Sequence, residues 1–394
     1  MEIGVSTYLK KINRSLIISK IIEHGMISRS DLSTITKLTK ATISTQVAEL
    51  IADELIVETN QEYHNVGRKP IMLSLNPDAG CALGIDLDYG KITFTITDMM
   101  GQPVQSEQME LESSNYEEVL QFLIKQIKEY QEGYSHSRLG IVGVVIGIHG
   151  TVKKDEIIGF VPQFKWYNKD LRRDIEKKLG LVVYVENNAN LCAFAEKVLN
   201  CHGSENLISI NMYSGIGLGI LINGELVKGY QGYAGEIGHM IINPNGKLCN
   251  CGNSGCWELY ASEVSFFKQL AEKLNLSKMT YKDIKNLIIA RDSIVLTQME
   301  EYIHVISIGL NNIINLLNPD TVVLNSALLK LFPEAEDKIK ANLKSSVSDF
   351  KQLMISELGS NACVMGACAL AIKKFFEITD LSLTIEQNAM EQMI

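Results

Sequence analysis

The feature that most constrains this sequence is a short segment with three cysteines, one histidine and several glycines. The four side chains are His239, Cys249, Cys251 and Cys256. Three thiols and one imidazole are a donor set that suits tetrahedral Zn2+. Because a Cys-x-Cys pair cannot converge on one ion from a single helical turn, we expect a loop that wraps the ion, with glycines at its tight turns. Four protein ligands leave no position for water, which indicates a structural zinc.

Two carboxylates flank this segment, Glu236 and Glu258. A saturated Cys3His site does not need them as ligands, so the metal would hold them in place for another task. Two alternatives remain: the carboxylates could simply support the loop, or the four candidate ligands could be unrelated buried polar residues. The close Cys/His spacing favours the metal site.

Composition bounds the class of protein. The chain has 394 residues, 46% of them hydrophobic, which is enough for two or three domains. No stretch has the apolar length of a membrane span, and Met1–Lys11 lacks the pattern of a secretory signal. The other cysteines lie among apolar or small residues, so we expect buried thiols in a cytoplasmic protein. They are Cys81, Cys192, Cys201, Cys363 and Cys368.

The net charge of −9 is unevenly distributed. Residues 1–75 hold nine Lys/Arg and eight Asp/Glu, whereas the remainder holds 28 and 38. A near-neutral N-terminal region on an acidic body fits a region that approaches a polyanion while the body does not.

Residues 1–78 have the pattern of a winged helix-turn-helix domain. Apolar spacing predicts helices over 9–21 and 40–52, and Ser30 is placed to cap a short helix that ends at Thr36. Two helices separated by a brief break, the second with a polar outer face, are typical of this DNA-binding motif. The residues expected to contact DNA are Arg29, Lys40, Thr42, Ser44, Thr45 and Gln46.

A predicted hairpin follows these helices, with strands over 55–58 and 71–75. Its tip, Gly67-Arg68-Lys69-Pro70, offers Arg68 and Lys69 to a narrow minor groove of A·T-rich DNA. The alternative is a small helical packing domain with solvated charges, which the wing residues disfavour.

From residue 79 onward the pattern predicts an α/β body in which strand, glycine turn, strand and helices occur twice. The strand over 181–185 ends at Asn187 and Asn188, and open α/β sheets bind ligands at such strand ends. The glycine-rich run 214–219 can either cradle a phosphate or form a tight hairpin. Further strands are expected over 82–86, 92–97, 104–111, 139–148, 207–211, 220–226 and 321–324, and helices over 116–130, 191–199, 263–274, 283–290, 300–317 and 363–376.

These residues resemble the ROK family of repressors, open reading frames and sugar kinases. The resemblance rests on the 214–219 run, Glu236–His239 and Cys249–Glu258, and it covers essentially the whole chain. Residues 1–78, the head of the chain, resemble the DNA-binding module of the family's repressors, including its xylose and N-acetylglucosamine repressors. The implied fold class is α/β, with a winged helix-turn-helix domain at 1–78 and a two-lobed, actin-like sugar-kinase body at 79–394 that carries a zinc loop. The lobes would be roughly 79–190 and 191–394, and the C-terminal helix could return to the first.

The resemblance implies a monosaccharide site in the body. Amide groups both donate to and accept from ring hydroxyls, carboxylates accept from them, and zinc would fix the ring of its histidine ligand. The residues so implied are Asn187, Asn188, Glu236, His239, Glu258 and Gly150.

Three departures from the family's kinases indicate that phosphoryl transfer has been lost. Asn188 stands where the kinases have an Asp general base, and an amide cannot take a proton near neutrality. Asp88 adds negative charge to the first phosphate loop, and Asn325-Ser326-Ala327 replaces the Gly-Gly pair of the adenosine loop. His149 in place of Pro, and Gln163 where the family often has Asn, leave the sugar open.

We therefore predict a repressor of carbohydrate-use genes and no enzyme activity. It would bind a palindromic operator as a homodimer or higher oligomer. A monosaccharide would shift the equilibrium between two arrangements of its DNA-binding heads. The alternatives are a sugar kinase with a fused regulatory head and a zinc- or redox-responsive regulator. The sequence leaves open whether the sugar is xylose, glucose or an amino sugar.

Overall fold

The computed structural model describes residues 2–59 and 71–386, with side chains from residue 7 onward. The chain divides into two compact units. The first contains the described residues up to Gly150, the segment Glu156–Glu186 and the residues from Val364 onward. The second contains Thr151–Asp155 and Asn187–Cys363. None of the helices among the described residues is both long and apolar enough to cross a bilayer.

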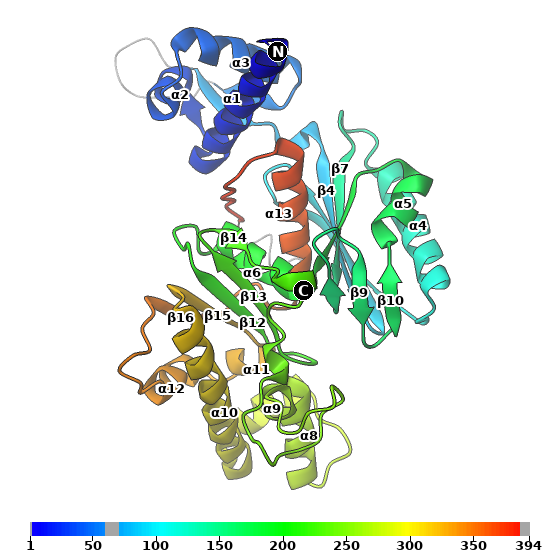
Figure 1. The fold of residues 1–394 in the computed structure, drawn as a ribbon, viewed down its shortest axis with the longest axis vertical. Coiled ribbons are helices and arrows are strands. Elements are labelled where there is room, and N and C mark those ends of the chain that lie inside the picture. Colours follow the sequence, from blue (N-terminus) through cyan, green and yellow to red (C-terminus); the bar gives the residue numbers. More distant parts are fainter. Residues whose placement is uncertain (1, 60–70, 387–394) are drawn as a thin grey trace. The chain divides into compact units, whose positions relative to one another are not determined.

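The N-terminal part of the first unit is a head of three helices and a small antiparallel sheet (Figure 1). Its strands run in the order β1-β3-β2. The predicted helices and both predicted strands are confirmed, and the two-residue strand β1 is an addition. The elements are α1 (Glu2–His24), β1 (Ile27–Ser28), α2 (Arg29–Thr36), α3 (Lys40–Ala52), β2 (Ile56–Thr59) and β3 (Met72–Leu75).

The start of α2 corrects one prediction. Its N-cap is Ser28, whose Oγ accepts from the N–H of Asp31 at 3.1 Å, and not Ser30. Ser28 pairs with Met72 in the small sheet and therefore already has the extended backbone that an N-cap requires.

The head contacts the rest of the first unit mainly through α1. Ser15 and Ser19 donate to the carbonyl oxygens of Phe376 and Asp380, at 3.1 and 3.2 Å. The guanidinium of Arg138 donates at 2.9 Å to the carbonyl oxygen of the last residue of α3. These bonds attach the first and third helices of the head at separate points.

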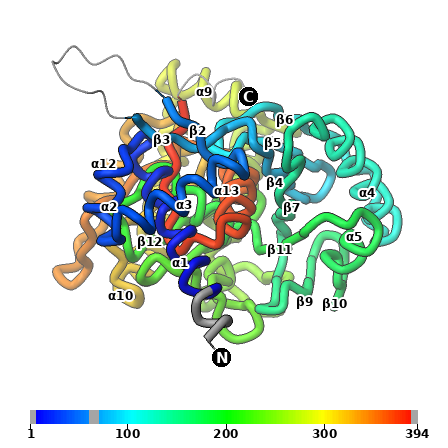
Figure 2. The backbone as a smooth tube through the Cα atoms, turned by 90° about the horizontal axis from the view of Figure 1, so that it is seen from above, coloured from blue at the N-terminus to red at the C-terminus, as the bar shows by residue number. Residues whose placement is uncertain are grey.

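The remainder of the first unit contains a five-stranded sheet in the order β11-β7-β4-β5-β6. It also contains two antiparallel strands of a separate small sheet, β9 (Ile158–Val161) and β10 (Trp166–Lys169). Figures 1 and 2 show α13 on one face of the five-stranded sheet and α4 and α5 on the other. Gly84 lets α13 approach β4 closely, because a Cβ there would lie 2.4 Å from the carbonyl oxygen of Val364. On the opposite face, Phe94 packs against Phe122 and Tyr130 of α4. The elements are β4 (Cys81–Asp88), β5 (Lys91–Asp98), β6 (Pro103–Glu110), α4 (Tyr116–Gly133), β7 (Ile141–Ile148), α5 (Leu171–Leu179), β11 (Val183–Asn187) and α13 (Ala362–Phe376).

The second unit contains another five-stranded sheet, in the order β14-β13-β12-β15-β16. Helix α6 covers one face, and a core that includes Trp257 and Tyr302 covers the other. The sequence predicts the strands up to β15 and the longer helices here, but not α7, α11, α12 or β16. The elements are α6 (Asn188–Leu199), β12 (Leu207–Asn211), β13 (Gly217–Ile222), β14 (Glu225–Leu226), α7 (Glu258–Ala261), α8 (Glu263–Lys273), α9 (Tyr281–Ile289), α10 (Ser293–Leu317), β15 (Thr321–Asn325), α11 (Ala327–Lys330), α12 (Ala335–Asn342) and β16 (Gln352–Ile355).

Candidate metal centre and surrounding polar residues

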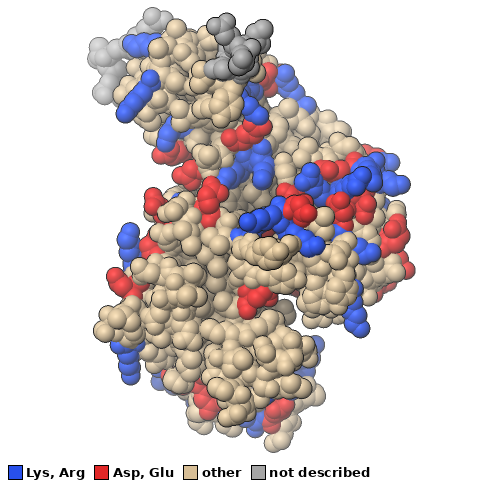
Figure 3. Space-filling model, viewed as in Figure 1, with Lys and Arg blue, Asp and Glu red and all other residues tan. Residues whose placement is uncertain are grey.

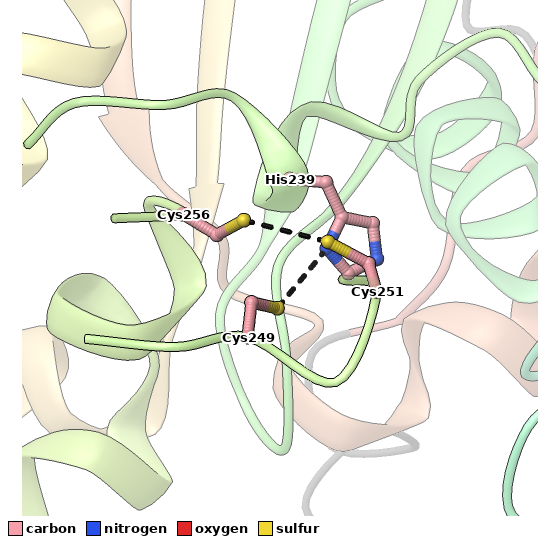
Figure 4. A group of neighbouring side chains, drawn as sticks. All are labelled: His239, Cys249, Cys251 and Cys256. Atoms are coloured by element: carbon pink, nitrogen blue, oxygen red, sulfur yellow. Dashed lines mark hydrogen bonds between the residues drawn. The ribbon is translucent and has the colours of Figure 1, made fainter. Parts of the chain in front are cut away.

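The four predicted metal ligands lie together in the second unit, as Figure 4 shows. Their donor atoms are all within 4.8 Å of one another. The Sγ atom of Cys249 is 3.7 Å from Nδ1 of His239, and the Sγ atoms of Cys251 and Cys256 are 3.6 Å apart. A tetrahedral zinc with bonds of about 2.1–2.3 Å has ligand-to-ligand edges of roughly 3.5–3.8 Å. The separations of these two pairs therefore match the edges of a single tetrahedral site.

Glycines and a short backbone bridge give the loop its shape. Gly252 and Gly255 have φ angles of +98° and +79°, in the left-handed region that favours glycine. A Cβ at Gly255 would lie 1.6 Å from the carbonyl oxygen of Asn243, so no larger residue fits without moving the backbone. Ile241 forms a bridge with Cys256, which returns the chain beside its own start.

Without a metal, the surroundings favour the protonated form of two of the three thiols. Burial raises the pKa of the Cys249 thiol to about 12 and also raises that of Cys256. A hydrogen bond from the backbone of Asn253 lowers the pKa of Cys251, whose side chain is exposed. Metals bind the thiolate form, so an ion here would displace protons that burial otherwise holds on two thiols.

Glu258 lies directly beside the ligand cluster. Its Oε1 atom is 3.3 Å from Sγ of Cys249 and 3.4 Å from Nδ1 of His239. Its Oε2 atom lies 3.3 and 3.4 Å from the points where a Cβ would stand on Gly215 and Gly238. The two glycines therefore make room for the carboxylate, which touches the metal loop on one side and a glycine-rich segment on the other.

Glu236 precedes the short 3-10 helix Ile237–His239 that carries the histidine ligand. Loss of hydration raises the pKa of its carboxyl group; Glu258 adds to this and His239 opposes it. The side chain nevertheless remains exposed, so a ligand in solution can reach it.

Asn187 and Asn188 lie at the start of α6. Asn187 is the N-cap, and its Oδ1 atom accepts from the N–H of Asn190 at 3.1 Å. Asn188 is the first helical residue, so the two amides lie at the end of α6 where the helix dipole is positive.

The glycine-rich run 214–219, for which a phosphate-binding loop was one alternative, continues into strand β13, which begins at Gly217. A Cβ at Gly219 would lie 2.3 Å from the carbonyl oxygen of Ala189, and one at Gly217 would lie 3.1 Å from the Ala189 side chain. These glycines therefore allow α6 to lie directly on the strand. Since Gly215 adjoins Glu258, this segment also links the start of α6 to the metal loop.

The loop after β7 carries His149 and Gly150 in the first unit. His149 Nε2 is 2.8 Å from Oδ1 of Asp86, and Nδ1 is 3.5 Å from Oδ1 of Asp88. Burial lowers the pKa of His149, but the two carboxylates outweigh it and the net direction is upward. Gly150 lies against β9 (Ile158–Val161), since a Cβ there would be 2.3 Å from the carbonyl oxygen of Phe160.

The segment that replaces the kinases' Gly-Gly pair belongs to a buried hydrogen-bond network. Asn325 Nδ2 donates to Oδ1 of Asn211 at 3.2 Å, and Ser326 Oγ donates to Oε1 of Glu263 at 2.6 Å. The same Oε1 accepts from the N–H of Leu328 at 2.8 Å. Glu263 cannot be recognised as part of this network from sequence, because an acidic residue at the start of a helix normally indicates a solvated first turn.

The predicted DNA-contacting residues of α3 divide into two groups. Lys40, Ser44 and Thr45 are exposed, and Thr42 is half-buried. Gln46 is only 5% exposed and faces the interior of the head, because it shares the inward face with the apolar residues of α3. Its side chain would have to move to reach a base.

The remaining predicted DNA contacts lie outside α3. Arg29, the first residue of α2, forms an ion pair with Glu58 at 2.7 Å. Arg68 and Lys69 of the wing lie outside the described residues. Figure 3 shows scattered Lys and Arg side chains on a head surface that is otherwise mostly uncharged on the face drawn.

Comparison with known proteins identifies similar chains. The sequence profile of the family described as "ROK family" matches residues 82–374. A "Xylose repressor" of Bacillus subtilis (strain 168) is 35% identical over 383 residues, which cover 96% of this chain and 99% of that protein. A solved structure of a ROK family transcriptional regulator, described as a homolog of E. coli MLC protein, superimposes with a TM-score of 0.81 at 26% identity and covers 94% of this chain and 97% of that one. A ROK family glucokinase from Streptomyces griseus, in complex with glucose and AMPPNP, gives a TM-score of 0.65 at 25% identity and covers 74% of this chain and 99% of that one.

Proposed function

The chain belongs to the ROK family, and from that premise we propose that it is a repressor of carbohydrate-use genes whose affinity for operator DNA is controlled by a monosaccharide. The observation that carries this proposal is the extent of the similarity. The xylose repressor matches 96% of the chain, whereas the glucokinase matches 74%. The head lies outside residues 82–374, which the family profile matches, and it has the helices of a DNA-binding module.

The zinc loop serves as the structural support of the effector site in this proposal. His239, Cys249, Cys251 and Cys256 hold one Zn2+ ion, and its four ligands leave no open position for catalysis. When bound, zinc fixes the ring of His239 and the loop that presents Glu258.

The monosaccharide is bound by polar groups that surround the metal loop and the start of α6. We assign hydroxyl contacts to five residues of the second unit, Asn187, Asn188, Glu236, Glu258 and His239. The proximity of Glu258 and α6 to one glycine-rich segment supports this assignment for the second unit. Amides and carboxylates together satisfy hydroxyl groups, which both donate and accept.

The protein acts on DNA as a homodimer or higher oligomer in the cytoplasm, with two heads on a palindromic operator. Lys40, Thr42, Ser44, Thr45, Arg29, Arg68 and Lys69 contribute DNA contacts, and Gln46 contributes only if it leaves the interior. Sugar binding shifts the population between two arrangements of the heads.

A sugar kinase with a fused regulatory head is the second candidate, because the body superimposes on a ROK family glucokinase. Three features argue against it. Asn188 is not a base, Asp88 adds a carboxylate next to the first loop, and Asn325-Ser326 is tied into a buried network.

The decisive experiment combines a thermal-shift screen with DNA binding. Pentoses, hexoses and amino sugars are tested for a rise in melting temperature, and each positive sugar is then added to protein bound to a DNA duplex selected from a random library. We expect one sugar to raise the melting temperature and to change DNA affinity. Sugar-dependent ATP turnover in a coupled assay would establish the kinase instead, and a protein that enriches no DNA sequence contradicts the repressor assignment.

A further inference from the structure

We propose that helix α3 reads its operator through the 5-methyl groups of thymine, using Ala41, Thr45 and Ala48, and that the bases facing α3 are therefore rich in thymine. This inference rests on the proposed function, because it presupposes that the head binds DNA. It adds two residues, Ala41 and Ala48, that the sequence pattern did not single out, and it names the chemistry by which the helix discriminates bases.

The outward face of α3 is defined by burial. Ile43, Val47 and Leu50 are buried in the head and mark the inward face. At 100° per residue, the exposed residues span an arc of about 140° on the other side. They are Lys40, Ala41, Ser44, Thr45, Ala48 and, at the last position of the helix, Ala52.

The polar groups of α3 are largely engaged with the protein itself. Thr45 Oγ1 donates to the carbonyl oxygen of Ala41 at 3.1 Å, so the methyl group is the part of Thr45 that can meet a base without breaking that bond. The hydroxyl of Thr42 lies 2.9 Å from that of Thr39, which also caps the helix. Gln46 faces inward.

The acidic groups near the far end of the helix are paired. Lys10 of α1 lies 2.8 Å from Glu49, and Arg14 of α1 lies 2.7 Å from Asp53. These pairs reduce the repulsion of phosphates by the two carboxylates, but they place no donor on the outward face.

This set of groups favours one kind of readout. Bidentate recognition of guanine or adenine in the major groove uses Arg, Asn or Gln. Helix α3 contains no Arg or Asn, and its one Gln is buried. The methyl groups of Ala and Thr instead make apolar contact with the thymine methyl, while Lys40 and Ser44 can hold phosphates. The two alanines and Thr45 are therefore the groups on α3 best suited to distinguish bases.

The test removes the thymine methyl alone. A duplex is first enriched from a random library by the full-length protein, and thymine is then replaced by deoxyuridine one position at a time in each half-site. Affinity is measured by fluorescence anisotropy at fixed salt. We expect at least two positions at which deoxyuridine weakens binding about fourfold, the effect of one buried methyl-sized group. The 5-methyl group lies in the major groove, so minor-groove contacts by the wing do not respond to this change.

Variants then assign each methyl to its partner. Ala41→Gly, Thr45→Ser and Ala48→Gly are each measured with the thymine and the deoxyuridine duplex. When the substituted residue is the one that contacts a given thymine methyl, the ratio of the affinities for the thymine and deoxyuridine duplexes should fall from about four in the wild type to about one in that variant. Because each ratio compares two DNAs with the same protein, a general loss of helix stability cancels. Ala52→Gly is the matched control: it removes an exposed methyl from the same helix, beyond the N-terminal part that meets bases, and its ratio should stay at the wild-type value.

Each outcome decides a different point. An enriched duplex that binds equally well with deoxyuridine at every position overturns this inference and leaves the repressor function standing. A methyl effect that survives in all three variants also overturns it, because another element must then contact those methyls. If no sequence is enriched, the proposed function fails and this inference fails with it.

Discussion

The carboxylate of Glu258 lies 3.3 Å from the sulfur of Cys249, so a residue assigned to sugar contact touches a residue assigned to the metal. The other oxygen of Glu258 lies over Gly215 and Gly238, where a side chain would exclude it. One carboxylate therefore connects the metal loop to the segment on which α6 rests, and metal and sugar binding should be separable by changing it.

Replacing Glu258 by Gln keeps the volume of the side chain but removes its charge. We expect sugar affinity to fall roughly 10- to 100-fold, because hydrogen bonds to charged groups contribute about 1.5–3 kcal/mol. Zinc content should stay at one ion per chain, since Glu258 is not among the four ligands. Calorimetry with the sugar found by thermal shift, together with a colorimetric zinc assay, measures both. Unchanged sugar affinity would remove Glu258 from the site.

Removing one thiol should instead destabilise the fold. We expect Cys251→Ser to lower the melting temperature by roughly 5–10 °C, because binding of a structural metal contributes to the free energy of folding. A chelator should produce a similar loss in the wild-type protein and no further loss in the variant. If the chelator lowers both melting temperatures equally, the stabilising metal does not depend on Cys251.

The ion pairs of His149 predict a dependence of stability on pH. The folded-state pKa of this imidazole is raised, so its stabilising effect is present below the unfolded pKa of about 6.5 and is lost as the pH rises through the folded value. The difference in free energy of unfolding between wild type and His149→Gln should therefore be largest at low pH and decrease above neutrality. Urea unfolding across this range measures it, with His136→Gln, which lies outside this cluster, as the control. Lys91 acts in the opposite direction on His149 and is present in both proteins.

The packing of α6 on β13 predicts a steric effect of a single methyl group. Gly219→Ala places a carbon 2.3 Å from the carbonyl oxygen of Ala189, and overpacking of this kind costs about 1–3 kcal/mol. Gly203→Ala is the control, because no atom lies within 4 Å of its added carbon. Equal stability of the two variants in denaturant unfolding contradicts the close packing described here.

Local signals were enough to predict most helices, the main strands and the metal ligands. The helix over 40–52 and the cluster around His239 both follow from short-range spacing, which a sequence displays directly. The segment that contains α5 and β9 is not predicted from sequence. Its strands have four residues each, and α5 has nine residues of which only Leu171 and Ile175 are buried, so both patterns are too short to recognise. The sequence points to Ser30 as the cap of α2, because the pairing of β1 that fixes the backbone of Ser28 involves residues far along the chain.

The parts of the site that could not be predicted depend on contacts between distant residues. His149 and Asp86 are 63 positions apart, and no spacing rule brings them together. The burial of Gln46 depends on how the helices of the head pack, which helical periodicity only approximates. The same applies to Gly217 and Gly219: their spacing is compatible with a phosphate loop, and only the helix lying on them shows what they accommodate.

The contact between α6 and β13 has a consequence for how this protein can respond to an effector. With no gap between helix and strand, the two can be displaced only together, as one rigid body. An effector that meets the first residues of α6 would then encounter a surface already in its final form. A superposition of liganded and free crystals should therefore coincide across the start of α6 and the strand beneath it.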